Sequence, residues 1–338
     1  MTKTIKLAIT MGDPGGIGPE IALKAVCERK WPPFVKFVLI GGREVWLHCA
    51  KRFNVPPPPE CTAIDRNSLP RISCWEPSAL CAYAHNIADW HPGKTGCLCG
   101  HMAVVFIRAA VSLCMKHKYD GIVTGPICKS SIQSAGYGFP GHTEYLAHLT
   151  KSRKVAMMLI GGRLRVVLAT RHIPLARVAN SLNRRKIIET VEMANFGIKW
   201  LGVPQKTIGV CALNPHSGDG GMLGKEENIF IAPAIEQLRR AGLQVKGPIP
   251  ADVIFYQALQ NKFGAVVAMY HDQGLGPLKM ISFEKGVNLT LGLPFVRTSP
   301  DHGTAFDIAG QGIASASSMV EAIKLAIRLA RRPNPWKK

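Results

Sequence analysis

The 338-residue sequence has few acidic and aromatic residues and no long apolar run. Asp and Glu number 22 against 42 Lys and Arg, and aromatic residues make up 7%. No apolar stretch approaches the roughly 18 residues needed to span a bilayer. Residues 1–10 lead directly into Gly12-Asp13-Pro14 and are typical of a first strand rather than a signal peptide. We therefore expect a cytoplasmic protein with no membrane partner.

The shortage of acidic residues leaves a net charge of +20, which raises the question of nucleic acid as a partner. A strongly basic surface condenses on phosphates. The Lys and Arg residues are scattered along the chain, however, and no recognised nucleic-acid motif is present. A basic cleft for an anionic substrate, together with a lineage-wide charge bias, is favoured instead, and we expect no nucleic-acid partner.

Three histidines each follow a short apolar run. The runs and their histidines are 166–169 with His172, 208–213 with His216, and 265–269 with His271. Short β-branched runs that alternate with helix-length segments are typical of buried parallel strands, whose carboxyl ends meet at one edge of the sheet. Open α/β sheets bind ligands at that edge. Three imidazoles there favour a divalent-metal site with open positions for substrate.

The alternation of strands and helices predicts an α/β protein, and the length allows two domains. Further strands are expected at 6–10, 37–40 and 121–124. Helices are expected at 19–29, 101–117, 184–200, 226–241, 252–261 and 317–332. Gly125-Pro126 breaks the pattern, so we predict a domain crossover there.

Two glycine-rich segments have the composition of phosphate or dinucleotide loops. The first, residues 12–20, lies between a strand and a helix. Its spacing is not Gly-x-Gly-x-x-Gly, and Pro14 and Pro19 remove amide donors, so a tight turn on the floor of a cleft is favoured over a Rossmann site. The second, residues 301–310, resembles the loop that holds the adenosine of NAD in isocitrate and isopropylmalate dehydrogenases.

Longer motifs extend this resemblance over nearly the whole chain. In chain order they are Gly12-Asp13-Pro14, 140–144 (Pro-Gly-His-Thr-Glu), 213–216 (Leu-Asn-Pro-His), 247–252, 269–274, 286–288, 292–299 and 301–310. Together they resemble the 4-hydroxythreonine-4-phosphate dehydrogenase family of pyridoxal phosphate biosynthesis. The resemblance implies a two-domain isocitrate/isopropylmalate-dehydrogenase-like α/β fold with a cleft between the domains. With the crossover at Gly125, residues 1–125 and 298–338 form the first domain, and residues 126–297 form the second.

The resemblance also implies the site residues. One divalent ion per site, zinc, magnesium or cobalt, would be held by His172, His216 and His271. The second domain would carry these ligands and much of the interface of a homodimer with shared active sites. Substrate-contacting positions would be His142, Thr143, Lys279, Asn288 and Arg297. Cofactor-binding positions would be His302, Gly303, Asp307 and Gly310.

The proton acceptor is left open between two residues. Lys279 and Asp272 are both candidates by position, and Asp272 is equally suited to orient a metal ligand. Arg297 and Lys279 can neutralise the phosphate or carboxylate of a phosphorylated substrate, and Asn288 and Thr143 can hydrogen-bond its polar backbone.

The implied activity is NAD- or NADP-dependent oxidation of 4-phosphohydroxy-L-threonine. The product, 2-amino-3-oxo-4-phosphooxybutanoate, would decarboxylate to 3-amino-2-oxopropyl phosphate in pyridoxine 5'-phosphate biosynthesis. Three alternatives stay open. The first is a dehydrogenase of threonate or erythronate 4-phosphate, the substrates of related family members. The second is a three-histidine zinc hydrolase, which would have no use for the 301–310 loop. The third is a nucleic-acid-binding protein, which would use the net positive charge.

Overall fold

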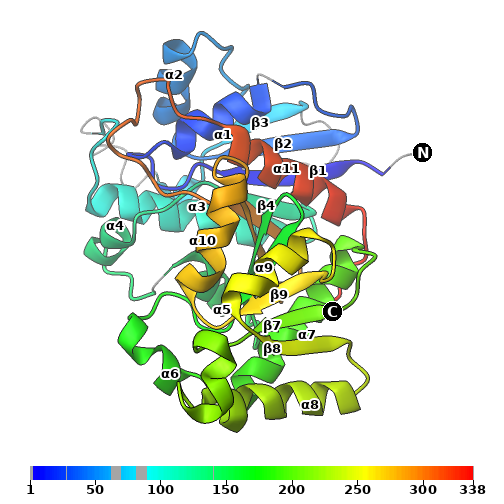
Figure 1. Ribbon diagram of the computed structural model, residues 1–338. Helices are drawn as coiled ribbons and strands as arrows, with labels where there is room; N and C mark the ends of the chain where they lie inside the picture. The colour runs from blue at the N-terminus through cyan, green and yellow to red at the C-terminus, as the bar shows by residue number, and fades with distance from the viewer. Residues whose placement is uncertain (1–2, 28, 62–69, 81–89, 140, 338) are drawn as a thin grey trace. The chain divides into compact units, whose positions relative to one another are not determined.

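Largely parallel strands covered by helices form the framework of the protein (Figure 1). The computed structural model describes residues 3–27, 29–61, 70–80, 90–139 and 141–337. The chain forms two units, the first from residues 1–153 and 293–338 and the second from residues 154–292. The α/β class predicted from the alternation of strands and helices is confirmed.

The sheet of the first unit has the strand order β3-β2-β1-β4-β11, and its pairings are all parallel. Its strands are β1 (Ile5–Thr10), β2 (Val35–Ile40), β3 (Ile72–Trp75), β4 (Gly121–Thr124) and β11 (Val296–Pro300). Its helices are α1 (Gly18–Cys27), α2 (Arg43–Arg52), α3 (Cys97–Met115), α4 (Lys129–Ser134), α5 (His142–Thr150) and α11 (Ser317–Ala330). The strands β4 and β11 are buried throughout, as expected for parallel strands covered by helices.

The sheet of the second unit has the strand order β10-β5-β6-β9-β7-β8. Its strands are β5 (Ala156–Gly161), β6 (Leu164–Leu168), β7 (Ile208–Cys211), β8 (Val245–Ile249), β9 (Ala265–Ala268) and β10 (Val287–Leu291). Only β5 runs antiparallel to its neighbours among these described strands. The helical segments are η2 (Leu175–Arg177), α6 (Val178–Ser181), α7 (Arg184–Leu201), η3 (Pro215–Gly221), η4 (Glu227–Ile231), α8 (Ala232–Arg240), α9 (Ala251–Leu259) and α10 (His271–Ser282).

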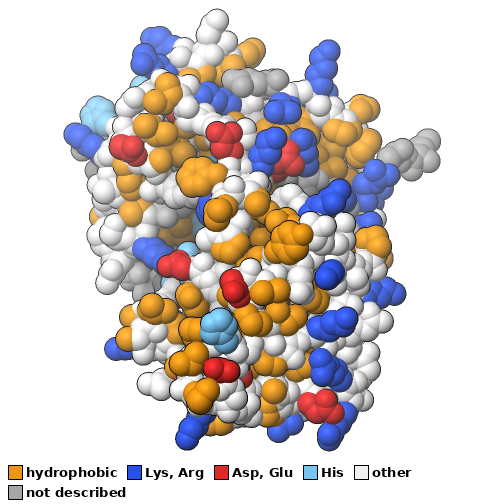
Figure 2. Space-filling view, in the orientation of Figure 1, with side chains coloured by type: hydrophobic (Ala, Val, Ile, Leu, Met, Phe, Trp, Pro, Cys, Tyr) orange, Lys and Arg blue, Asp and Glu red, His pale blue; other side chains and the backbone are white. Residues whose placement is uncertain are grey.

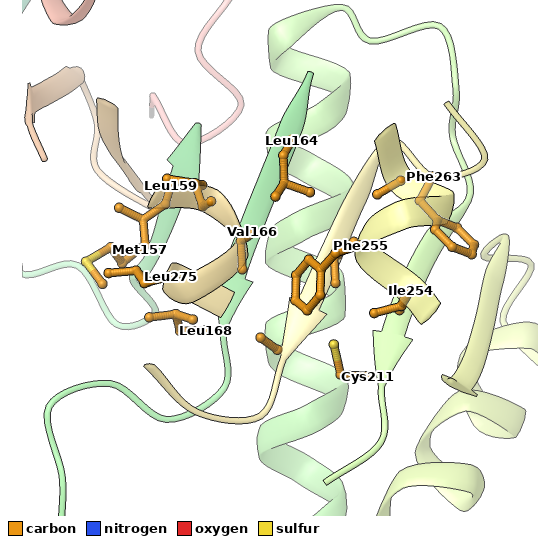
Figure 3. Close-up of a cluster of buried hydrophobic side chains, with 14 residues drawn as sticks. Met157, Leu159, Leu164, Val166, Leu168, Cys211, Ile254, Phe255, Phe263 and Leu275 are labelled. Atoms are coloured by element: carbon orange, nitrogen blue, oxygen red, sulfur yellow. The ribbon is translucent and has the colours of Figure 1, made fainter. Parts of the chain in front are cut away.

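The core of the second unit lies between this sheet and the helices α9 and α10. Every second residue of β6 points to this side, and Figure 3 shows Leu164, Val166 and Leu168 facing Phe255 and Leu275. Burial of each such leucine contributes about 2 kcal/mol to the free energy of unfolding. The core therefore holds α10 in a fixed position on the strands. This also fixes the first residue of the helix, His271, at the edge of the sheet.

The unit boundary differs from the predicted one. The first crossover follows Arg153 rather than Gly125, because α4 and α5 pack on α3 within the first unit. At Gly100 a Cβ atom would lie 2.0 Å from the backbone oxygen of Ser131, so only glycine lets α3 and α4 approach this closely. The return crossover also differs: β11 pairs with β4, which brings Arg297 into the first unit.

Helix α3 corrects the expectation that no segment is long and apolar enough to span a membrane. It has 19 residues and a mean hydropathy of 1.9, and 67% of its apolar window is buried. The helix contacts β1, β2 and β4 together with α4 and α5. Its apolar character is therefore explained by its place as the core helix of the first unit.

Candidate functional site

The three histidines predicted to bind metal follow three adjacent strands of the second unit. β9 lies between β6 and β7, and both pairings are parallel. His172 comes four residues after the end of β6, His216 five residues after β7, and His271 three residues after β9. The prediction that these runs are parallel strands with their carboxyl ends at one edge is confirmed.

His172 and His271 are brought together at this edge. Their ring centroids are 5.4 Å apart, with the ring planes inclined by 46°. Two imidazoles that bind one ion at about 2.1 Å have ring centroids about 5 Å apart, so this spacing fits a shared ion. His271 Nδ1 lies 2.7 Å from Asp272 Oδ1, so Nε2 is the ring atom that a metal ion could occupy. The exposed carboxylate of Asp272 therefore orients the His271 ring. This contact matches the second of the two roles predicted for Asp272, that of orienting a metal ligand.

His216 lies in a turn of left-handed backbone. The φ angles of residues 216–220 are 50°, 57°, 80°, 43° and 67°, although only two of these residues are glycines. Left-handed conformation costs about 1–2 kcal/mol for each non-glycine residue, and such strain is found mostly at functional sites. The turn begins next to Asn214, which is hydrogen-bonded to the buried carboxylate of Glu227.

A complete metal site is not assembled. Within the described part of the chain, no group of three or more His, Cys, Asp or Glu side chains is close enough to hold an ion. The residue types and the His172–His271 spacing fit a divalent metal. His216 does not join the other two histidines in a group that could hold an ion. The three-histidine site therefore stays a prediction.

Lys279 and Asn288 lie on the same face of the second sheet as α10. Lys279 is two turns after His271 on this helix, and its Nζ lies 5.3 Å from the centroid of the Phe283 ring. Asn288 in β10 is opposite Leu159, which belongs to the core under α10, and opposed residues of a sheet share a face. The buried Oδ1 atom of Asn288 has no hydrogen-bond partner among the described residues. It therefore has an acceptor to offer a ligand.

A second cluster of predicted site residues surrounds Arg297 in the first unit. Arg297 is 1% exposed, and its Nη2 donates a hydrogen bond of 2.7 Å to Thr124 Oγ1. His142 at the start of α5 is close enough for its pKa to be affected by the Arg297 charge, and Thr143 beside it is buried. The Pro140 residue that opens this motif lies outside the described residues. Arg297, His142 and Thr143 are thus the predicted substrate-binding residues that the first unit contains.

The electrostatics of this cluster favour an anionic ligand. Burial lowers the pKa of Arg297 to about 9, and the carboxylate of Glu144 opposes this shift. Burial, followed by the charge of Arg297, lowers the pKa of His142 well below its usual value, so this imidazole is neutral. Within the part of the chain that the structure describes, His142 Nε2 is buried without a hydrogen-bond partner. A bound phosphate or carboxylate would compensate the buried cation and supply that partner.

The loop at 301–310 is supported by two other segments of the first unit. Ile17 N donates to Thr304 O at 2.8 Å, which ties the loop to the first glycine-rich turn. Gly310 has a φ of 76°, and a Cβ atom there would lie 2.5 Å from Pro92. A Cβ atom at Gly303, in contrast, would meet nothing within 4 Å. Gly310 is therefore required by the packing of the loop, whereas Gly303 faces open space.

The first glycine-rich turn has its amides engaged within the protein. Gly15 N donates to Asp13 Oδ1 at 3.0 Å, Gly16 N to Asp13 O at 3.1 Å, and Ile17 N to the 301–310 loop. These are the amides that would otherwise face a pyrophosphate. Burial raises the pKa of Asp13, against hydrogen bonds from Ser131, Gly15 and Cys99. The geometry fits the prediction of a tight structural turn rather than a phosphate loop.

A cavity of about 470 Å³ adjoins the segment that packs on the 301–310 loop. Its lining includes Trp90, His91, Lys94 and His101. Rings combined with a cation are what an aromatic, negatively charged ligand needs, and the volume is in the usual range for small-molecule sites. Sequence reasoning missed this cavity, as it missed Thr124, Glu144 and Glu227. Thr124 had a signal in its position at a strand end, and Glu144 in its place at the end of the 140–144 motif, whereas Glu227 belongs to no recognised motif.

Comparisons with known proteins agree over nearly the full length. The family model described as pyridoxal phosphate biosynthetic protein PdxA matches residues 35–326. The chain is 44% identical over 336 residues to the 4-hydroxythreonine-4-phosphate dehydrogenase of Desulforapulum autotrophicum, covering 95% of this chain and 94% of that protein. It is 39% identical over 333 residues to the D-threonate 4-phosphate dehydrogenase of Pectobacterium atrosepticum, covering 96% of this chain and 99% of that protein.

A solved structure gives the same fold. The crystal structure of 4-hydroxythreonine-4-phosphate dehydrogenase from Klebsiella pneumoniae matches with a TM-score of 0.82 at 36% sequence identity. The match covers 97% of this chain and 100% of that one. The fold class predicted from the sequence is therefore confirmed by a relative of known structure.

Proposed function

Because the chain belongs to the PdxA family of pyridoxal phosphate biosynthetic proteins and is a dehydrogenase of that type, we propose that it oxidises 4-phosphohydroxy-L-threonine. The product would be 2-amino-3-oxo-4-phosphooxybutanoate, which decarboxylates to 3-amino-2-oxopropyl phosphate in pyridoxine 5'-phosphate biosynthesis. The observation that carries the proposal is the arrangement of His172, His216 and His271 after three adjacent parallel strands.

The histidines would hold one divalent ion, zinc, magnesium or cobalt. Imidazole nitrogens accept all three, so the ligand type does not select among them. When bound, the ion would polarise the substrate's hydroxyl group and lower its pKa. Asp272 would fix the tautomer and orientation of His271 through their 2.7 Å contact.

Substrate binding would use charge neutralisation and hydrogen bonds. Arg297 would pair with the phosphate or the carboxylate, and neutral His142 would offer Nε2 beside it. Lys279 would contact the substrate as a neutral amine, the form that can accept a proton, and the Thr143 hydroxyl and Asn288 Oδ1 would bond the polar backbone of the substrate. Lys279 is our candidate for the proton acceptor, since Asp272 is engaged with His271.

The cofactor would bind along the 301–310 loop, at His302, Gly303, Asp307 and Gly310. NAD or NADP would supply the hydride acceptor for the alcohol carbon. The Ile17–Thr304 hydrogen bond and the contact of Gly310 with Pro92 would keep this loop in position. The cavity lined by Trp90 and Lys94 offers room for a nucleotide next to it.

We also propose that the protein is a homodimer with shared active sites. The segments that follow the three histidines carry large exposed apolar side chains. Leu175 is 71% exposed, Met222 is 80% exposed, Met280 is 89% exposed and Phe283 is 75% exposed. Figure 2 shows hydrophobic side chains gathered over α9 and α10. Exposed apolar clusters of this kind mark protein interfaces, and a second copy would cover them beside the metal ligands.

A second candidate substrate is D-threonate 4-phosphate. The D-threonate 4-phosphate dehydrogenase of Pectobacterium atrosepticum is 39% identical to this chain, close to the 44% of the relative from Desulforapulum autotrophicum. The two substrates share the phosphate and the secondary alcohol and differ at the position of the amino group. The same metal, cofactor and Arg297 contacts would therefore serve either substrate.

The test is NADH or NADPH formation by the purified protein with added zinc, magnesium or cobalt. Turnover is compared on 4-phosphohydroxy-L-threonine, threonate 4-phosphate and erythronate 4-phosphate. We expect the highest kcat/KM on the amino acid phosphate. A clear preference for a sugar-acid phosphate would select the second candidate. No turnover on any of them, with metal and cofactor bound, would refute the proposal.

A further inference from the structure

The left-handed turn that carries His216 is wrapped around one buried carboxylate. Glu227 is 2% exposed, and Oε1 accepts hydrogen bonds of 2.8 Å from both Leu213 N and Asn214 N. Its Oε2 accepts a third bond, of 2.9 Å, from Asn214 Nδ2. The two residues that connect β7 to the turn are therefore held by a single side chain located further along the sequence.

The turn also packs closely against this carboxylate, with no room for a side chain at two of its glycines. A Cβ atom at Gly218 would lie 2.7 Å from Glu227 Oε2, and one at Gly224 would lie 2.3 Å from Asn214 Nδ2. Glu227 itself is the first residue of the π-helical segment η4, a geometry that is rare and often found at functional sites. Backbone, glycine and carboxylate thus form one closed unit from Leu213 to Glu227.

The strain in the turn needs an opposing interaction. His216, Ser217 and Asp219 are left-handed without being glycine, so the isolated segment would relax to ordinary backbone angles. Such relaxation would move His216 away from the direction set by β7. The hydrogen bonds at Leu213 and Asn214 lie on the N-terminal side of the strained residues, and the Gly218 contact lies within them. Glu227 therefore acts on both parts of the turn.

We propose that Glu227 is a positioning residue that holds His216 in the orientation needed to bind the metal ion. The inference rests on the proposed function, in which His216 is a ligand, but it concerns a carboxylate that does not touch the ion itself. Partners that orient metal ligands typically change metal affinity by 10- to 100-fold when they are replaced. The expected effect of removing the carboxylate lies in that range.

The experiment compares the full-length variants Glu227→Gln and Glu227→Ala with the wild type. Binding of Co²⁺ alone is titrated by calorimetry and by its visible absorption, and thermal unfolding is followed separately. We expect the Co²⁺ dissociation constant to rise about tenfold or more in Glu227→Ala, and less in Glu227→Gln. The matched control is Glu236→Gln, which removes an exposed carboxylate that pairs with Arg240 on the same helix.

Two further readouts report the turn without any metal. Lys225 is exposed within the closed segment, so opening of the turn should speed trypsin cleavage after this residue. Amide hydrogen exchange at Leu213 and Asn214 should speed up in parallel. Replacement of Asp219, which has a φ of 43°, by glycine should remove strain and restore part of the Co²⁺ affinity of Glu227→Ala.

The outcomes separate this inference from the proposed function. If His216→Ala binds Co²⁺ as the wild type does, His216 is not a ligand and the metal assignment fails, whatever Glu227 does to the turn. If His216→Ala loses Co²⁺ while Glu227→Ala keeps wild-type affinity, the positioning role of Glu227 is refuted. Unchanged cleavage at Lys225 and unchanged exchange at Leu213 would refute it as well. A lowered melting temperature with unchanged Co²⁺ affinity would reduce Glu227 to a structural residue.

Discussion

Replacement of Arg297 by methionine tests whether the buried cation binds the anionic part of the substrate. Methionine is unbranched and apolar, so it removes the charge while filling most of the space. Alanine would leave a large cavity at a side chain that is 1% exposed, and a loss of packing would then be mixed with a loss of binding. Arg297→Met is therefore the more informative variant.

The magnitude follows from the contacts of the guanidinium. A hydrogen bond to a charged group contributes about 1.5–3 kcal/mol, so the loss of the Arg297 contact should weaken substrate binding by about 2–3 kcal/mol. At about 1.4 kcal/mol per factor of ten, this corresponds to roughly 30- to 150-fold in the substrate constant. The effect on stability should be small. Thr124 loses its 2.7 Å hydrogen bond, but the protein no longer has to bury a cation.

The assay is steady-state kinetics, with substrate varied at saturating NAD and NAD varied at saturating substrate. We expect the Michaelis constant for substrate to rise by the factor above and that for NAD to change less than threefold. Arg240→Met, in an exposed pair on α8, is the control for the loss of a positive charge. Equal increases in both constants would show that Arg297 holds the unit together. An unchanged substrate constant would show that it does not bind substrate.

The same variant predicts a pH dependence. Burial lowers the pKa of Arg297 to about 9, so the cation is present below this pH and is lost as the pH rises through it. Substrate affinity of the wild type should therefore fall above about pH 9, and the fall should be absent in Arg297→Met. A titration with the same alkaline limb in both proteins would assign it to another group.

Three more predictions concern the metal and the glycine-rich segments. Changing His172, His216 or His271 to Ala should abolish bound metal and turnover with an unchanged circular dichroism spectrum. If a variant retains both metal and activity, the replaced histidine is not a metal ligand. Gly303→Val should raise the Michaelis constant for NAD at least tenfold more than that for substrate, because the new side chain meets only open space in the free protein. Gly15→Val should instead prevent folding, since its Cβ would lie 1.9 Å from a backbone oxygen of the neighbouring loop, and soluble expression measures this.

The sequence was most informative where apolar runs and turn residues agree. The runs before His172, His216 and His271 are β6, β7 and β9, and their parallel direction follows from the alternation with helices, whereas their adjacent positions became known only from the structure. The resemblance to the dehydrogenase family, based on motifs in a fixed order, is confirmed by the family match. Local patterns sufficed here because a buried parallel strand needs continuous apolar residues on both faces.

Other features depend on contacts between distant residues. The predicted crossover at Gly125 is a turn inside the first unit, because the close approach of Gly100 to α4 has no local signature. The support of the His216 turn by Glu227 has none either, since a buried glutamate in a polar segment reads as a surface residue. The metal ligands, the substrate contacts and the cofactor positions remain predictions. His172 and His271 lie close together, whereas His216 does not join them in a group that could hold an ion.

The strand β11 gives this chain a particular order of events during synthesis. It follows the whole of the second unit in sequence, yet it pairs with β4 and carries Arg297. While the ribosome is still making the second unit, β4 has an open edge with unpaired amides and carbonyls. The second unit is continuous and can fold as it emerges, whereas the first must wait for the last segment. A chain that is interrupted before β11 would therefore lack both Arg297 and the 301–310 loop. Such a chain would expose the aggregation-prone edge of β4 and would have no partial activity.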